Sequence, residues 1–142
     1  EFYSSCDSVN KIYDVFGGSG NLTKSFTDSQ VSILDNFCDK SKLLEHQSFL
    51  KTDLYKEPIV PDSSADLIIF DPPRSGFKEA LDWINELEPR YVGYQSCFSD
   101  TMIRDLKKIG PHWEATSIHM LDFFPSTHHY ESIIFLKNNR AK

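Results

Sequence analysis

The chain has 142 residues, 39% of them hydrophobic and 25% charged, which is the size and composition of a single globular domain with a buried core. No run of about 18 apolar residues occurs, so a membrane-spanning helix is excluded, and the N-terminus lacks the basic and apolar stretches of a signal peptide. The net charge of −6 means that attraction to a nucleic acid requires a local basic patch or a separate domain.

Short apolar runs alternate with stretches of helical spacing, a pattern typical of an α/β fold with a mostly parallel sheet. Five of these runs predict strands, at residues 11–16, 31–34, 48–51, 66–70 and 91–94. A helix is expected from Asn21, a weak helix or loop leads on to Glu45, and residues 56–65 form a loop. Helices are also expected over residues 77–87 and 99–109.

Two β-rich runs end the chain, at residues 113–124 and 130–136, and the turn between them predicts a hairpin. We therefore expect a doubly wound sheet with one antiparallel strand. Ligands of such sheets bind beyond the carboxyl ends of the strands. The polar features predicted at strand carboxyl ends are the segment 14–20 and the residues Asp35, Asp53, Asp71 and Cys97. We expect them to meet at one rim.

The turn Gly17-Gly18-Ser19-Gly20 lets a ligand approach the backbone closely, and a helix N-terminus after it suits a carboxylate. It has neither the spacing of the dinucleotide-binding fingerprint nor the lysine of a phosphate-binding loop. Asp35 is placed to accept hydrogen bonds from a ribose. Together these features indicate an adenosine-type ligand without a pyrophosphate, although a plain strand-to-helix turn has the same glycines.

Asp71 ends the fourth strand and precedes two prolines, which fix the backbone and hold the carboxylate rigidly; the alternative is a stiff loop with an Asp cap. Cys97 ends the fifth strand before a helix N-terminus, a setting that favours thiolate and suits a nucleophile. A lone cysteine at a strand end is otherwise a small buried apolar residue. Cys6 and Cys38 lack such a setting, and three widely spaced cysteines indicate a reducing, cytoplasmic location.

Glu131 lies at the start of the last strand, where its carboxylate becomes a general base if the sheet brings it near Cys97. His129 shares a strand face with Glu131, but a third metal ligand at a recognisable spacing is missing, so we expect no metal site. The pair Arg104-Asp105 is interpreted as a solvated pair on a helix. Arg74 and Arg104 are candidate contacts to RNA phosphate.

Four segments of the chain are similar to consecutive motifs of one family. They are residues 14–23, similar to D-x-[FY]-C-G-x-G-[NT]-[FL]-[ST]; 71–76, to D-P-P-R-x-G; 94–106, to Y-x-S-C-N-P-x-T-x-x-R-D-L; and 122–131, to D-x-F-P-x-T-x-H-x-E. Over residues 14–136 the chain thus resembles the C-terminal catalytic domain of the RNA 5-methyluridine methyltransferases. The resemblance implies a Rossmann-like class I S-adenosylmethionine-dependent methyltransferase fold, mostly parallel with a C-terminal antiparallel hairpin, and tRNA or rRNA as the partner.

The same resemblance implies roles for individual residues. Cys97 would attack carbon 6 of a uracil flipped out of the RNA, which makes carbon 5 nucleophilic enough to accept a methyl group. Glu131 would remove the carbon-5 proton, so that the enzyme is released by elimination. The residues implied to surround S-adenosylmethionine are Phe16, Asn21, Asp35, Asp53 and Asp71.

The chain departs from the family pattern in four places. Gly17 stands where a cysteine is common, which is harmless for a turn, and Asp35 stands where a glutamate is usual. Phe98-Ser99 replaces Asn-Pro after Cys97. The N-terminal RNA-binding parts, and a glutamine-bearing segment near the cofactor, are absent. Residues 1–142 are therefore expected to be one catalytic domain, a fragment of a longer protein.

Two alternatives remain open. An RNA 5-methylcytosine methyltransferase also uses a thiolate at carbon 6, but typically carries a cysteine in the Pro-rich motif that residues 71–74 lack. Amino-group methyltransferases often have an aromatic residue where Arg74 stands. The other alternative is a non-catalytic domain that binds S-adenosylmethionine or only a partner protein.

Overall fold

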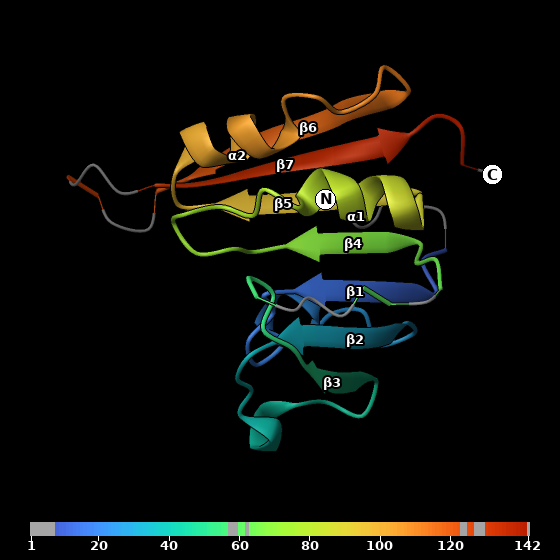
Figure 1. The fold of residues 1–142 in the computed structure, drawn as a ribbon. Coiled ribbons are helices and arrows are strands. Elements are labelled where there is room, and N and C mark those ends of the chain that lie inside the picture. The colour runs from blue at the N-terminus through green and yellow to red at the C-terminus, as the bar shows by residue number, and fades with distance from the viewer. Residues whose placement is uncertain (1–7, 57–59, 62, 123–124, 127–129, 142) are drawn as a thin grey trace.

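The computed structural model describes residues 8–56, 60–61, 63–122, 125–126 and 130–141, which build one seven-stranded sheet with two α-helices (Figure 1). The strands are β1 (Lys11–Val15), β2 (Gln30–Asp35), β3 (Gln47–Lys51), β4 (Leu67–Phe70), β5 (Tyr91–Ser96), β6 (Trp113–Leu121) and β7 (Glu131–Asn138). The helices are α1 (Ala80–Leu87) and α2 (Ser99–Leu106), and two short 3₁₀ turns are η1 (Asn21–Thr23) and η2 (Lys40–Lys42). None of these helices is long and apolar enough to span a membrane.

The strand order is β3-β2-β1-β4-β5-β7-β6, with β1 to β5 parallel and β7 antiparallel to both of its neighbours (Figure 1). The predicted parallel sheet with a C-terminal antiparallel hairpin is confirmed. The chain builds outward from β1 to β3 and then returns to place β4 on the other side of β1. This reversal opens a crevice at the carboxyl ends of β1 and β4, the place where ligands of such sheets bind.

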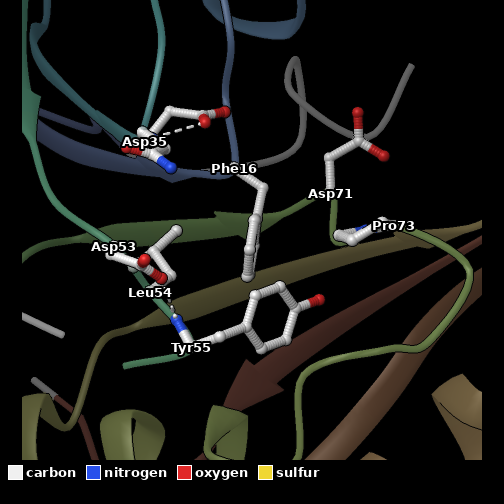
Figure 2. A pocket seen from close by; sticks show the side chains of 8 residues that line it. Phe16, Asp35, Asp53, Leu54, Tyr55, Asp71 and Pro73 are labelled. Atoms are coloured by element: carbon white, nitrogen blue, oxygen red, sulfur yellow. Dashed lines mark hydrogen bonds between the residues drawn. The ribbon is translucent and has the colours of Figure 1, made fainter. Parts of the chain in front are cut away.

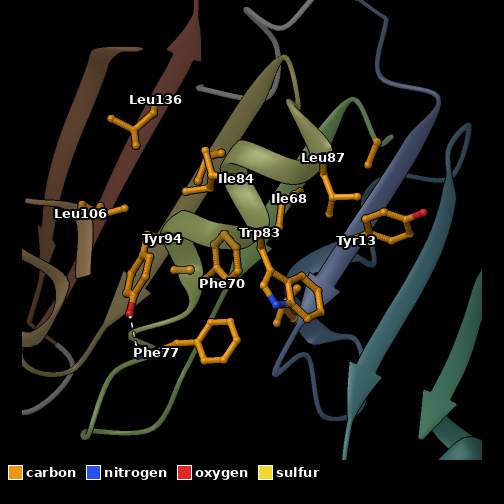
Figure 3. Packing of buried hydrophobic residues seen from close by; sticks show 14 of the residues in the cluster. Tyr13, Ile68, Phe70, Phe77, Trp83, Ile84, Leu87, Tyr94, Leu106 and Leu136 are labelled. Carbon is orange, nitrogen blue, oxygen red and sulfur yellow. Dashed lines mark hydrogen bonds between the residues drawn. The ribbon is translucent and has the colours of Figure 1, made fainter. Parts of the chain in front are cut away.

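Apolar side chains on both faces hold the sheet between two cores. Every residue of β4 is buried, as expected for a central parallel strand. The larger core lies between the sheet and both α-helices and is rich in aromatic rings (Figure 3). Its largest fully buried side chains include Trp83, Tyr94, Phe70 and Phe77. The smaller core, on the opposite face, is covered by apolar residues of the connecting turns, among them Leu22 and Phe26.

The helix expected from Asn21 is wrong, because the structure forms only the three-residue turn η1 there. The Thr23 hydroxyl donates to Asp14 Oδ2 at 2.8 Å and also contacts the Gly20 carbonyl, so it fixes the turn against β1. Ser and Thr side chains that bond locally in this way compete with helix formation. Within the described residues, α-helices therefore cover one face of the sheet and turns cover the other.

Candidate active site

The turn after β1 is fixed by its backbone and by β2. Phe16 adopts a left-handed conformation with φ of 65°, which is uncommon for a residue with a side chain. Its N–H donates to the Leu34 carbonyl at 2.8 Å, and the Gly18 N–H donates to Asp35 Oδ2 at 2.9 Å. The carboxylate at the end of β2 thus holds the glycine turn against the end of β1.

A cavity of about 400 Å³ opens at the carboxyl ends of the parallel strands, a volume in the range of small-molecule sites (Figure 2). Its lining residues are Phe16, Asp35, Asn36, Asp53, Leu54, Tyr55, Asp71 and Pro73. The rings of Phe16 and Tyr55 lie 5.4 Å apart and form an apolar wall, while three carboxylates supply negative charge. A ligand with a flat ring, hydroxyl groups and a positive charge fits this combination.

Four of the five residues implied to bind a cofactor line this cavity, namely Phe16, Asp35, Asp53 and Asp71. Asn21 does not line it; it lies in η1 with an exposed side chain. Its implied contact with a cofactor stays a prediction.

Asp14 lies under the glycine turn as a fully buried carboxylate. Its Oδ2 accepts the Thr23 hydrogen bond, whereas Oδ1 has no hydrogen-bond partner among the described residues. Burial raises the pKa of Asp14 to about 7, opposed by the Thr23 hydrogen bond and assisted by the charges of Asp71 and Asp35. A Cβ on Gly17 would lie 2.6 Å from Asp14 Oδ1, so the glycine makes room for this carboxylate. The absence of a side chain at position 17 is therefore required by the packing against Asp14, and is more than harmless for the turn.

Buried hydrogen bonds fix the loop that carries Asp71 and Pro73. Asp105 on α2 is 3% exposed, and its Oδ2 accepts from the Phe77 N–H and from the Tyr94 hydroxyl, each at 2.6 Å. Burial, together with the Asp105 carboxylate, raises the pKa of Tyr94, so its hydroxyl remains a donor. The end of the loop, the strand β5 and the helix α2 are thereby joined through one carboxylate.

The interpretation of Arg104-Asp105 as a solvated helical pair is wrong. The Arg104 guanidinium donates to Asp105 Oδ1 at 2.6 and 2.8 Å and to the Ser75 carbonyl at 2.9 Å. The Tyr55 hydroxyl donates to the Gly76 carbonyl at 2.9 Å from the cavity side. The pair therefore braces the loop beside the cavity.

The sheet register brings Cys97 and Glu131 to the same end of β5 and β7. Ser96, the last residue of β5, pairs with Ser132 of β7; Cys97 follows the end of β5, and Glu131 precedes Ser132 as the first residue of β7. Cys97 is an exposed free thiol.

The charge of Glu131, at the start of β7, acts on Asp71 in the wall of the cavity. Burial raises the pKa of Asp71 to about 6, and the charges of Glu131 and then Asp35 contribute to this rise. Burial also raises the pKa of Glu131 itself. The thiol, the base candidate and a cavity carboxylate thus gather at one rim, formed by the ends of β4, β5 and β7.

The sequence did not identify every residue that lines the cavity. Leu54, Tyr55 and Pro73 line the cavity, although only the neighbouring aspartates were predicted. Asp105 was detectable, because Met102, Asp105 and Leu106 recur at helical spacing and share one buried face of α2. Within the described residues no cluster of three metal-ligating side chains occurs, and His129 lies outside them.

Comparisons with known proteins point to one family. A model of the tRNA (Uracil-5-)-methyltransferase family matches residues 53–139. The 23S rRNA (uracil(747)-C(5))-methyltransferases RlmC of Proteus mirabilis and of Serratia proteamaculans are 29% and 32% identical, over 90% and 93% of this chain. The 23S rRNA (uracil(1939)-C(5))-methyltransferase RlmD of Shewanella woodyi is 29% identical over 87% of it. The chain spans only 37%, 38% and 31% of these three proteins.

Solved structures support the fold. The tRNA (uracil-54, C5)-methyltransferase of Pyrococcus abyssi, in complex with S-adenosyl-L-homocysteine, matches with a TM-score of 0.73 and 24% identity, over 95% of this chain and 36% of that one. The N-methyltransferase NodS of Bradyrhizobium japonicum matches with a TM-score of 0.68 and 14% identity, over 92% and 86%. The predicted class I methyltransferase fold is confirmed.

Proposed function

Since the chain belongs to the tRNA (uracil-5-)-methyltransferase family, we propose that it transfers a methyl group from S-adenosylmethionine to carbon 5 of a uridine in tRNA or rRNA. The observation that supports this proposal is that Cys97 and Glu131 adjoin the last residue pair of β5 and β7, and that the charge of Glu131 raises the pKa of the cavity carboxylate Asp71. The curated relatives are named for 23S rRNA and the similar solved structure for tRNA, so both classes of RNA remain candidates.

The cavity suits S-adenosylmethionine by its chemistry. Asp35 and Asp53 offer carboxylate oxygens to ribose hydroxyls and to the adenine amino group, and the rings of Phe16 and Tyr55 offer an apolar wall to the purine. Asp71 adds negative charge for a cationic ligand. When bound, S-adenosylmethionine would supply an electrophilic methyl group on a sulfonium and would leave as the thioether S-adenosylhomocysteine.

The remaining chemistry belongs to the side chains of this protein. The Cys97 thiolate forms a bond to carbon 6 of the uracil, and the electrons of the C5=C6 double bond move toward the carbon-4 oxygen as an enolate. Carbon 5 then accepts the methyl group. The Glu131 carboxylate takes the carbon-5 proton, the C5=C6 double bond forms again, and the thiolate leaves carbon 6. The raised pKa of Glu131 suits it to accept that proton.

RNA carrying 5-fluorouracil tests the nucleophile, because fluorine at carbon 5 cannot leave as a proton does and the covalent adduct persists. With S-adenosylmethionine present, we expect a protein–RNA adduct that Cys97→Ala abolishes. Cys38→Ala, which removes the other described cysteine, should still form it. An adduct that survives in Cys97→Ala removes the assignment of this thiol. If the wild-type protein forms no adduct and methylates no uridine, or methylates cytosine instead, the proposed function is wrong.

The base is tested on ordinary RNA. Glu131→Gln should accumulate a methylated covalent complex, since elimination requires removal of the carbon-5 proton. Denaturing gel electrophoresis with labelled methyl donor detects this complex. Turnover at the wild-type rate in Glu131→Gln would exclude this carboxylate as the base.

A further inference from the structure

An exposed aromatic ring lies directly beside the candidate nucleophile. Phe98 follows Cys97 and is 39% exposed, a large apolar side chain at the rim of the site. The Arg74 guanidinium lies over its ring, 5.1 Å from the centroid, so one face is held by a cation. The Ser96 hydroxyl bonds both the N–H and the carbonyl of Phe98, at 3.0 and 2.9 Å. The ring thus projects from a fixed backbone.

A second exposed ring lies beside the candidate base. Tyr130 precedes Glu131 and is 38% exposed. Its hydroxyl lies 3.2 Å from the Ser99 hydroxyl, at the start of α2. Phe98 and Ser99, the two residues that replace Asn-Pro of the family pattern, therefore contact Arg74 and Tyr130. One exposed ring flanks each reacting side chain.

A group of basic side chains lies around the C-terminal end of α2. Lys78, Arg104, Lys107 and Lys108 line a hollow of about 360 Å³ together with Leu81 and Asp105. Asp105 is already bonded to Tyr94, Phe77 and Arg104, whereas the three lysines make no ion pair within the described residues. In a chain of net charge −6 this is a local basic surface of the kind that binding to a polyanion requires.

We propose that Phe98 and Tyr130 form a stacking platform for unpaired bases of the RNA beside the target uridine, with the phosphates of that strand held by Lys78, Lys107 and Lys108. Aromatic faces that stack on splayed bases, next to cations that track the backbone, are the general means of holding single-stranded RNA. The platform adjoins Cys97 and Glu131, where the reacting base must lie, so the occupant that fits is the neighbouring part of the same strand. This inference rests on the proposed function.

Steady-state methylation of a short single-stranded RNA by the full-length protein tests the platform. Base stacking corresponds to about 5- to 150-fold in affinity per base, so Phe98→Leu should raise KM for RNA roughly tenfold. The affinity for S-adenosylmethionine should not change, and Phe98→Tyr should restore the KM. Ile103→Ala removes a more exposed apolar side chain on α2, 62% exposed against 39% for Phe98, and should leave KM as in the wild type.

The outcomes separate the two hypotheses. Absence of uridine methylation by the wild-type protein contradicts the proposed function. If the wild-type protein is active and Phe98→Leu has the same KM, the platform is wrong while the function stands. If Phe98→Leu and Phe98→Tyr lose activity equally, with altered S-adenosylmethionine binding, the ring has a structural role and the platform is also wrong.

A direct readout of stacking is available by fluorescence. Trp83 and Trp113 are buried, so Phe98→Trp introduces the exposed indole next to Cys97. Single-stranded RNA should quench its emission, while a duplex of the same sequence should not. Ile103→Trp gives an exposed indole on α2 as the control. Quenching that is equal for both variants, or absent in Phe98→Trp, overturns the inference.

Salt dependence tests the basic surface. The double variant Lys107→Gln and Lys108→Gln should weaken RNA binding and reduce the slope of log affinity against log salt by about 1.4, at about 0.7 per phosphate neutralised on a single strand. The same change at Lys24 and Lys137, exposed lysines away from the hollow, is the control. Equal effects of the two double variants would show that the attraction is general and not localised along α2.

Discussion

Replacing Asp14 by asparagine should stabilise the chain, and increasingly so as the pH rises. The pKa of Asp14 is raised from 3.8 to about 7, mainly because the carboxylate is buried. At 1.36 kcal/mol for each pKa unit, ionising this group in the folded state costs roughly 4 kcal/mol more than in the unfolded state. Because the pKa of Asp14 is higher in the folded than in the unfolded state, its ionisation takes nothing from the free energy of unfolding below about pH 4. The free energy of unfolding then falls as the pH rises toward 7, and is constant above about pH 7 as far as Asp14 is concerned. The neutral amide of the Asp14→Asn variant does not titrate and has no such dependence.

Urea unfolding followed by circular dichroism at pH 4.5 and pH 8 measures this difference. We expect the gain in unfolding free energy for Asp14→Asn over the wild type to be larger at pH 8 by at least about 2 kcal/mol, half the full amount, since structural relaxation reduces the cost of burying a charge. Asp82→Asn, on the exposed side of α1, is the control and should show no such trend. A gain for Asp14→Asn that is equal at both pH values would refute the assignment of a buried, proton-binding carboxylate under the glycine turn.

Three further predictions concern the support of the site and use the same urea assay. Asp105→Ala leaves the Tyr94 hydroxyl and a backbone N–H without their acceptor and should cost about 1–3 kcal/mol; an unchanged midpoint would mean that this carboxylate does not hold the loop. Gly76→Ala should cost more than Gly18→Ala, since both residues have positive φ but only at Gly76 does a Cβ meet other atoms, among them Arg104 Nη2 at 2.6 Å; equal costs would contradict the close packing at Gly76. Trp83→Ala should cost about 3–5 kcal/mol because its ring is fully buried, and a loss below about 1 kcal/mol would place it outside the core.

The strands were predictable because central parallel strands are buried on both faces and leave continuous apolar runs. Residues 67–70 illustrate this, since all four are buried and their strand has neighbours on both sides. The short turn that replaces the helix expected after Gly20 was not predictable in the same way. Helical spacing can be read from the sequence alone, whereas the turn depends on a hydrogen bond from the Thr23 hydroxyl to the Asp14 carboxylate, which forms only in the folded chain.

The rim of the site followed from topology, because a parallel sheet brings the carboxyl ends of its strands to one edge. That rule placed Asp35, Asp53 and Asp71 around one cavity. The rule does not say which way side chains in the loops point, so the positions of Tyr55 and Pro73 in the cavity wall were not predicted. The adjacency of Cys97 and Glu131 depends on the register of β5 and β7, which local spacing does not specify.

The two sides of the rim differ in how firmly they are held. Asp105 connects α2, β5 and the loop beside the cavity through buried hydrogen bonds, and Ser96 fixes the backbone on the far side of Cys97. Because these contacts lie within the protein itself, they fix the positions of Cys97 and Asp71 relative to one another before RNA binds. Phe98 and Arg74, in contrast, contact one another at the surface, where exchange of the ring or of the cation would change the exposed side chains beside Cys97 without altering the buried network. Under the proposed function, changes in RNA choice are therefore expected at Phe98 and its neighbours, while the residues that bond Asp105 are constrained by folding.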